Sequence, residues 1–373
     1  MADTPTAATP NPQEQLEGEL AKARKFLDYL QQASARGDHA DDDQLASLGM
    51  ALTPRHTWYE EGSCRLLEFP VPAGVTPRPI PLLMIYSFIN RWYILDLMPG
   101  HSFIEALGRR GYQVYMLDWG CPGPEHATLG LDYYLETVAR RAMERICRRH
   151  RVDRLFLFGY CLGGTLAAMM AARRPERYEG LVLLTTPLDF TEAGLLSLWT
   201  NKEFFKPEKI AEAYGVVPDK LLHASFPWMN PKATLAKGRT LYDNIMNDAF
   251  LTNFRSLDRW GTDNVPFPGR VFKEIIKNCY QDNQLAKGEF SLGGRRLDLG
   301  AITCPTLNLF AKNDNIAPPS ACGRTAGLLS GCRTTDREYD ATHHSISVGR
   351  PICEVVQRET ADWLDAIPPR RKP

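Results

Sequence analysis

The sequence lacks any apolar run long enough to cross a membrane, a span that takes about 18 residues, and its charged residues interrupt every candidate. It also lacks the basic start and apolar core of a secretory signal, since it opens MADTPTAATPNPQEQ. We therefore expect a cytoplasmic protein without a transmembrane segment.

An excess of either charge is missing too. The 44 basic and 44 acidic residues cancel, so the composition does not indicate a nucleic-acid partner. The nine cysteines form no Cys-x-x-Cys pair and no close cluster with histidine, which argues against a metal site and for reduced thiols.

What the sequence does contain, from about residue 64, is an alternation of short apolar runs with longer amphipathic segments. The apolar runs predict strands at 81–88, 112–119, 155–158, 181–186 and 305–311. The intervening segments, such as 101–111 and 131–150, predict helices. Continuous apolar strands separated by helices are typical of a mostly parallel sheet covered on both faces, so we expect an α/β fold.

Two regions depart from this alternation. Residues 1–45 combine a small, polar, Pro-containing start (1–12), expected to be disordered, with a predicted amphipathic helix. Residues 191–295 are rich in aromatics, Met and Pro, with helical stretches such as 240–257, and predict a cap inserted over the site. The catalytic core would then comprise 46–190 and 296–373.

The predicted N-terminal helix has one apolar stripe, made by Leu16, Leu20, Ala23, Leu27 and Leu30. Their spacing of four and three residues places them on one helix face. The stripe either packs on the chain's own core or binds a partner helix, and the sequence alone leaves both open.

The stretch from 155 to 165, LFLFGYCLGGT, carries the clearest functional signal. An apolar strand runs into Cys161, which is flanked by Gly159, Gly163 and Gly164, and an Ala- and Met-rich helix follows. Strand, sharp turn and helix with a reactive residue at the turn is the nucleophile elbow of α/β-hydrolases. A buried core cysteine is the alternative, but the glycines at this spacing favour the elbow.

An elbow nucleophile is followed along the chain by an acid and then a histidine. Only His343 and His344 lie after the last predicted strand, and spacing does not choose between them. Asp314 follows the strand 305–311 and is the expected acid, since Asp340 is too close to the histidines and Asp118 ends a different strand.

The oxyanion formed in such a site is stabilised by two backbone N–H groups. One belongs to the residue after the nucleophile, Leu162. The other lies in the loop 87–90, after the strand 81–88, and Ile89 is our candidate there.

These blocks together resemble the catalytic subunit of polyhydroxyalkanoate (PHA) synthases over about residues 80–365. The similarity includes GYCLGG (159–164), NRWYILDL (90–97), VYMLDWG (114–120), TTPLDF (185–190), YQDN (280–283) and NDNIAPP (313–319). No long N-terminal domain precedes them, so the chain resembles the short class III or IV type, which works with a second, non-catalytic subunit.

The resemblance places the family's cysteine on Cys161, its aspartate on Asp314, its histidine on His344 and its cap tryptophan on Trp260. Two departures stand out: the family usually has Gly-His-Ile where this chain has His343-His344-Ser345, and a histidine where this chain has Asn315.

The resemblance implies an acyltransferase that polymerises (R)-3-hydroxyacyl-CoA, expected to be 3-hydroxybutyryl-CoA, with release of CoA. A thiol nucleophile suits this chemistry, because exchanging one thioester for another keeps the acyl group activated. Implied with it are no metal or organic cofactor, a polyester chain or granule surface as partner, and a homo-oligomer. A thioesterase, thiol esterase or polyester depolymerase on the same fold is the alternative, and a granule-coat protein is a third.

Overall fold

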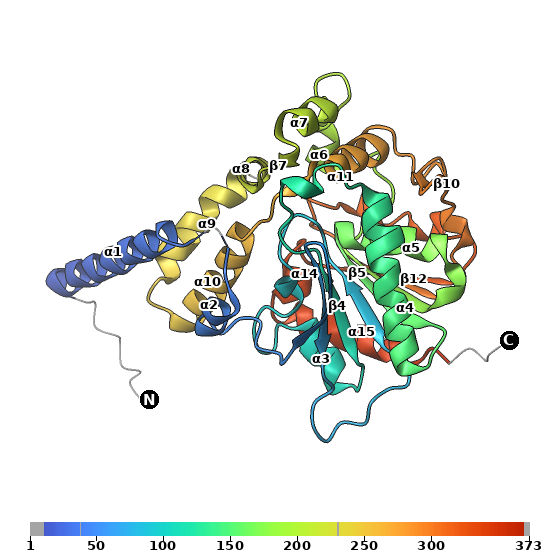
Figure 1. Cartoon of the computed structure of the whole chain (residues 1–373). Coiled ribbons are helices and arrows are strands. Elements are labelled where there is room, and N and C mark those ends of the chain that lie inside the picture. Colours follow the sequence, from blue (N-terminus) through green and yellow to red (C-terminus); the bar gives the residue numbers. More distant parts are fainter. Residues whose placement is uncertain (1–10, 38, 230, 369–373) are drawn as a thin grey trace, which may run out of the picture.

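The computed structural model describes residues 11–37, 39–229 and 231–368 (Figure 1). Residues 1–10 of the tail expected at 1–12 lie outside the described ranges. The rest of the expected α/β architecture is present.

A single eight-stranded sheet forms the centre of the molecule, in the order β1-β2-β4-β3-β5-β6-β11-β12. The strands from β4 to β12 pair in parallel. The β1–β2 and β2–β4 pairs are antiparallel. The apolar strands β3, β5 and β6 are buried along their whole length, as expected where helices cover both faces. The strand bounds are β1 His56–Glu61, β2 Cys64–Phe69, β3 Leu82–Ile85, β4 Val114–Asp118, β5 Leu155–Tyr160, β6 Tyr178–Leu184, β11 Thr306–Ala311 and β12 Thr334–Tyr339.

Helices cover both faces of this sheet. In Figure 1, α4 (Arg140–His150) lies in front of the strands and α15 (Ile352–Asp365) behind them. The helix α3 (Phe103–Arg109) packs against α15, and α5 (Leu162–Arg173) packs along β5 and β6. The helix predicted at 131–150 is α4 together with a π-helical stretch at Asp132–Ala139.

The segment between β6 and β11 is mostly helical, as its composition predicts. Its helices are α6 Gly194–Trp199, α7 Pro207–Tyr214, α8 Asp219–Met229, α9 Pro231–Asn244, α10 Asp248–Thr262 and α11 Gly269–Glu274. The single helix expected at 240–257 is in fact two, because the side chain of Asn247 accepts a hydrogen bond from the backbone of Phe250 (3.0 Å) and begins α10. From α11 onward, residues such as Val271 and Ile275 join the main hydrophobic core. The boundaries at 191 and 295 stay a prediction.

The predicted N-terminal helix is α1 (Pro12–Ser34), and it lies alongside α9 (Figure 1). It packs there through Phe26 and Tyr29: the Tyr29 ring contacts Phe254, and its hydroxyl donates to Asp258 (2.6 Å). The leucines of the stripe, in contrast, are 44 to 62% exposed. The helix therefore does pack on its own chain, but through a different face from the leucine stripe.

After α1 the chain crosses back between the helical insertion and the sheet. We call residue 37 and residues 39–41 the strap. The Gly37 carbonyl accepts a hydrogen bond from Arg259 (2.8 Å), and the Ala40 N–H donates to Asp263 (3.2 Å). Asp263 also accepts from the Tyr93 hydroxyl (2.8 Å), so this buried carboxylate joins the strap, α10 and the core. The strap leads into the short helix α2 (Asp42–Ser47).

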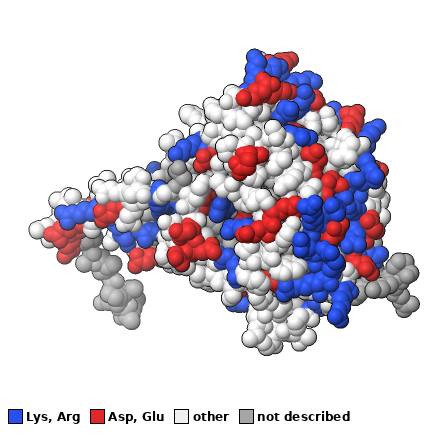
Figure 2. All heavy atoms as spheres, in the orientation of Figure 1, with Lys and Arg blue, Asp and Glu red and all other residues white. Residues whose placement is uncertain are grey.

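The balanced net charge conceals a local excess of arginine. Figure 2 shows Lys and Arg side chains gathered over the region of α4, whose sequence is RRAMERICRRH. Two of these arginines stack on aromatic rings of the edge strand β1: Arg145 on Tyr59 (4.0 Å) and Arg149 on Trp58 (4.8 Å). Separately, none of the helices in the described ranges has the length and apolarity to span a bilayer.

Candidate active site

The turn between β5 and α5 holds Cys161 in the geometry of a nucleophile elbow. Its backbone angles, φ 54° and ψ −130°, lie where residues with a side chain are rarely found. Its N–H donates to the Leu184 carbonyl of the neighbouring strand (2.8 Å), which helps to fix the turn. The thiol is thereby placed at the carboxyl edge of the parallel strands and is partly exposed.

The two glycines after Cys161 are needed because the backbone approaches its neighbours closely. A Cβ on Gly163 would collide with the backbone of Ile85 and Tyr86, and one on Gly164 would collide with the side chain of Thr186. The start of α5 therefore sits directly against the ends of β3 and β6. This brings Cys161 beside the loop that follows β3.

Asp314, the acid expected from the sequence, lies in the loop after β11. One carboxylate oxygen accepts the backbone N–H groups of Ile316 (2.8 Å) and Ala317 (2.9 Å), and the other lies 2.6 Å from Nδ1 of His343. Burial alone raises the pKa of this carboxyl, but the charge of His343 and these hydrogen bonds hold the pKa below its ordinary value. Asp314 is therefore ionised and oriented.

The histidine that joins Asp314 to Cys161 is His343, which is only 4% exposed. Burial alone lowers the pKa of its ring. The charge of Asp314, the nearby Cys161 and the hydrogen bonds to both overcome burial and raise the pKa to about 10. The three side chains thus form a connected line, Cys161–His343–Asp314.

The expectation that His344 pairs with Asp314 is wrong, because His343 takes that position. The His344 ring packs edge-on against Trp260, with 5.2 Å between the ring centres, and lies nearly perpendicular to His343. Burial and the charge of His343 lower the pKa of His344 to about 3. The physical reason is that adjacent side chains at the start of a short helix, α14 (Ser345–Val348), point in different directions, so a shift of one position exchanges the two environments.

The other carboxylates considered from the sequence have different partners. Asp340 accepts a hydrogen bond from the side chain of Asn313 (2.7 Å). Asp118 is fully buried and bound by Arg65 (2.6 Å) and the Tyr86 hydroxyl (2.7 Å). Neither is joined to His343.

The loop 87–90, where the second oxyanion donor is expected, is fixed on both sides. Phe88 stacks on Trp119, with 4.5 Å between ring centres. The Ile89 carbonyl accepts the Val265 N–H (3.1 Å), and Asn90 donates to the Asn264 side chain (2.6 Å). Leu162 opens α5, where helical N–H groups have no partner within the helix. The assignment of Leu162 and Ile89 as donors stays a prediction.

Sequence reasoning missed two residues that this geometry brings in. Tyr160 lies beside His343, with 5.8 Å between the rings. Asn264 holds the loop 87–90 from the insertion. The apolar run before Cys161 places Tyr160 at the end of a strand but gives no indication of its neighbour, and nothing in the sequence signals Asn264.

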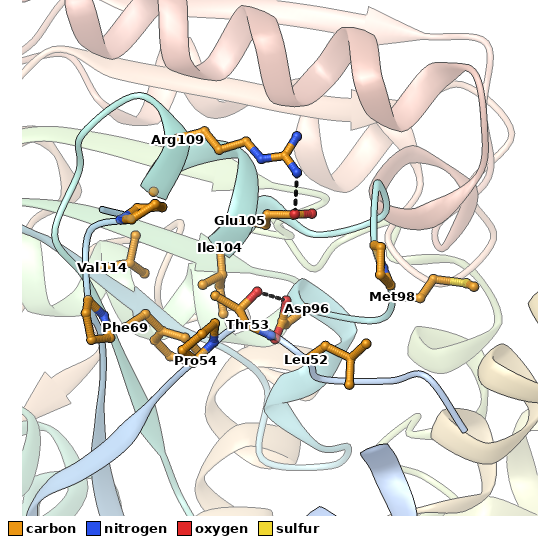
Figure 3. Close-up of a pocket in the computed structure, with 14 residues that line it drawn as sticks. Leu52, Thr53, Pro54, Phe69, Asp96, Met98, Ile104, Glu105, Arg109 and Val114 are labelled. Atoms are coloured by element: carbon orange, nitrogen blue, oxygen red, sulfur yellow. Dashed lines mark hydrogen bonds and ion pairs between the residues drawn. The ribbon is translucent and has the colours of Figure 1, made fainter. Parts of the chain in front are cut away.

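A cavity of about 340 Å³ lies elsewhere, between the β2–β4 part of the sheet and α3 (Figure 3). Its lining is largely apolar, and its buried Asp96 is engaged by Thr53 and Ser102. Cys161, His343 and Asp314 do not line it. Within the described ranges, no group of three or more His, Cys, Asp or Glu side chains is placed to hold a metal ion.

Comparison with known proteins first gives the class. The family described as alpha/beta hydrolase fold matches residues 80–350. Among solved structures, a thermostable carboxyl esterase from Bacillus coagulans superposes with a TM-score of 0.55 at 15% identity, covering 84% of this chain and 96% of the esterase. That likeness concerns the fold alone. The chain has the α/β-hydrolase fold.

Curated relatives narrow this to one family of enzymes. The poly(3-hydroxyalkanoate) polymerase subunit PhaC of Haloferax mediterranei is 32% identical over 339 residues, covering 90% of this chain and 68% of the relative. Those of Thiocystis violacea and Synechocystis are each 30% identical, covering 92% and 94% of this chain and 96% and 93% of the relatives. The chain belongs to the poly(3-hydroxyalkanoate) polymerase family, whose members are acyltransferases.

Proposed function

We propose that this enzyme polymerises (R)-3-hydroxyacyl-CoA, with 3-hydroxybutyryl-CoA as the first substrate to test, into polyhydroxyalkanoate with release of CoA. The observation that carries the proposal is the line Cys161–His343–Asp314 at a nucleophile elbow. It occurs in a chain whose relatives are named as polymerases of this polyester.

In the first step, the Cys161 sulfur attacks the thioester carbonyl with its proton already held by His343, whose pKa of about 10 keeps the ring protonated at neutral pH. The backbone N–H groups of Leu162 and of the loop 87–90, with Ile89 as candidate, stabilise the oxyanion. The carbon–sulfur bond to CoA then breaks, and His343 returns its proton to the departing thiolate. Asp314 keeps the His343 ring oriented and stabilises its charged form.

In the second step, the hydroxyl of another 3-hydroxyacyl group attacks the acyl-cysteine. His343 takes the hydroxyl proton as the new ester bond forms, and the Cys161 sulfur leaves with its charge balanced by the protonated His343 ring, which restores the starting state. Residues of the chain and the substrate supply every atom in both steps, so the proposal includes no metal or organic cofactor.

His343, and not His344, is the base in this scheme. The base must contact the nucleophile and must hold its proton at neutral pH, and His343 does so with its pKa raised to about 10. The lowered pKa of His344, about 3, and its packing on Trp260 meet neither need.

The exposed leucine stripe of α1 supports a docking surface for a non-catalytic second subunit. Four large apolar side chains on one helix face favour an apolar partner helix. We also propose that the enzyme is a cytoplasmic homo-oligomer that works at the surface of the polymer granule, with no nucleic-acid partner.

Incubation with 3-hydroxybutyryl-CoA tests the function directly. A polymerase releases CoA and makes the solution turbid with polyester, whereas a thioesterase releases CoA together with free 3-hydroxybutyrate. A non-enzymatic coat protein releases no CoA. Only the first result supports the proposal.

A further inference from the structure

A second cysteine, histidine and aspartate lie in line outside the site described above. The sulfur of Cys121 is 3.9 Å from Nε2 of His39, and Nδ1 of the same ring is 3.2 Å from Asp263. Cys121 is exposed, His39 is about one-third exposed, and Asp263 is fully buried. The order of groups is that of a thiol, a base and an orienting carboxylate.

These three residues come from three separate parts of the chain. Cys121 lies three residues beyond the end of β4, His39 lies in the strap, and Asp263 directly follows α10. Asp263 is itself fixed by the Tyr93 hydroxyl (2.8 Å) and the Ala40 N–H (3.2 Å). The carboxylate therefore holds the His39 ring with its other nitrogen toward the thiol.

The surroundings of Cys121 give this arrangement a chemical role. Although Cys121 is exposed, partial desolvation of its thiol raises the pKa and the charge of Arg91 opposes this, so at neutral pH the sulfur keeps its proton and needs a base. His39 is in place to take that proton. Arg91 also has a buried Nε–H that finds no acceptor among the described residues.

Contacts connect this group with the first site along the seam between the insertion and the sheet. Trp119, two residues before Cys121, stacks on Phe88 of the loop 87–90. The Arg91 carbonyl accepts the indole N–H of Trp260 (3.0 Å), and Trp260 packs on His344.

We propose that Cys121, His39 and Asp263 form a second nucleophilic thiol centre, which takes an acyl group from a CoA thioester. The thioester is the one named in the proposed function, on which this choice of ligand rests. His39 removes the Cys121 proton as the sulfur bonds to the thioester carbonyl carbon. The bond from that carbon to the CoA sulfur breaks, and the CoA thiolate takes the proton from His39. The products are an acyl-Cys121 thioester and free CoA.

The test uses the full chain with Cys161→Ala, so that only other thiols can be acylated. The protein is incubated with 3-hydroxybutyryl-CoA, digested with trypsin at mildly acidic pH and analysed by mass spectrometry. Peptide 111–140 contains Cys121 as its one cysteine, and peptide 325–333 contains Cys332 as its own. We expect a hydroxylamine-sensitive acyl adduct on 111–140, with CoA released in stoichiometric amount.

His39→Gln in the same background should slow this labelling by roughly 100-fold. His56→Gln, an exposed histidine on β1 that contacts Glu68, is the matched control and should change nothing. Iodoacetamide gives a second measurement that does not depend on CoA recognition. It should modify Cys121 faster than the half-buried Cys332, whose neighbours are hydroxyl groups and a carbonyl, and His39→Gln should remove the difference.

An unlabelled peptide 111–140, or labelling that His39→Gln leaves unchanged, overturns the inference. Turnover of the same substrate by the unaltered enzyme, measured in parallel, judges the proposed function separately. If the enzyme makes polymer but Cys121 is never labelled, the proposed function stands and the inference of a second centre is refuted.

Discussion

His343 and His344 are neighbours along the chain with opposite electrostatic environments. His343 is held by Asp314 and lies beside Cys161, which raises its pKa to about 10. His344 is partly buried against Trp260, and its pKa is lowered to about 3. At neutral pH, His343 therefore holds the proton that it shares with Cys161, whereas His344 stays neutral.

Substitution of each histidine by glutamine separates their roles. We expect His343→Gln to lower the rate of CoA release by roughly 10²–10⁴-fold, the usual contribution of a general base. His344→Gln should keep most of the rate, because it removes only a packing contact. Stopped assays of CoA release measure both, with thermal melting as the check on folding. If His344→Gln is the inactive variant, the assignment of the base is reversed.

Replacing Asp314 by asparagine tests the cause of the His343 shift. Without the carboxylate charge, burial dominates, so we expect the pKa of His343 to fall from about 10 toward or below its ordinary value of 6.5. The change is measured by NMR, from the pH dependence of the chemical shifts of the His343 ring. An unchanged His343 pKa in Asp314→Asn would show that the carboxylate is not responsible.

The same pair makes stability depend on pH. The folded pKa of His343 is raised, so its contribution is fully present below about pH 6.5 and is lost as the pH rises through about 10. The folded pKa of Asp314 is lowered, so its contribution is present above about pH 4 and is lost as the pH falls through the lowered value. The difference in melting temperature between the wild type and Asp314→Asn should therefore be largest between these limits and shrink on either side.

At the scale of elements, the elbow depends on close packing at the start of α5. Gly163→Ala forces a methyl group into the backbone of Ile85 and Tyr86, so we expect it to destabilise the fold by about 1–3 kcal/mol and to lower activity by moving Cys161. Gly238→Ala, in α9, is the matched control, because nothing lies within 4 Å of the added Cβ. It should stabilise the helix by about 0.5–1 kcal/mol. Urea unfolding measures both, and equal effects would refute the packing argument.

The helix α1 has two faces that should respond differently to substitution. Tyr29→Ala removes a buried ring and its bond to Asp258, so we expect a loss of about 3 kcal/mol where α1 meets α9 and α10. Leu20→Ser and Leu27→Ser, on the exposed stripe, should each change the stability of the isolated chain by less than about 0.5 kcal/mol. Calorimetry with the second subunit of a two-subunit synthase should show weaker binding for the leucine variants. Undiminished binding would rule out the stripe as the docking surface.

Sequence patterns predicted the elements wherever one local rule dominated. The apolar runs located β3 to β6 and β11, and the glycines around Cys161 located the elbow. The sequence patterns did not predict the strands β1 and β12. Both lie at the sheet edges and mix charged and apolar residues, as in HTWYEE and TTDREY. The packing face of α1 was also out of reach, since periodicity shows that a helix has an apolar stripe but not which neighbour covers it.

At the scale of the whole molecule, the parallel sheet made the order of the site residues along the chain predictable, but not the identity of each residue. Nucleophile, acid and histidine follow β5, β11 and β12 because the carboxyl ends of parallel strands meet at one edge. Features that depend on tertiary contacts were not predictable. These are the pairing of Asp314 with His343 instead of His344, the contact of Asn264 with the loop 87–90, and the contact of the strap with Asp263. Each of these pairs residues that are at least 29 positions apart.

The seam between the insertion and the sheet is where these long-range contacts gather. Asn90 meets Asn264, Tyr93 meets Asp263, and Trp260 meets Arg91. The helical insertion therefore holds in place the loop expected to stabilise the oxyanion. The proposed catalysis depends on the core and the insertion together.

The most direct test of the central claim is to look for the acyl chain on Cys161. Tryptic peptide 155–173 contains this cysteine alone, and after incubation with 3-hydroxybutyryl-CoA it should carry a hydroxylamine-sensitive series of 3-hydroxybutyryl units. Folded Cys161→Ala should lose the series and all multiple turnover. Sustained polymer formation by that variant, or an unmodified peptide from a wild-type sample that is releasing CoA, would contradict the account.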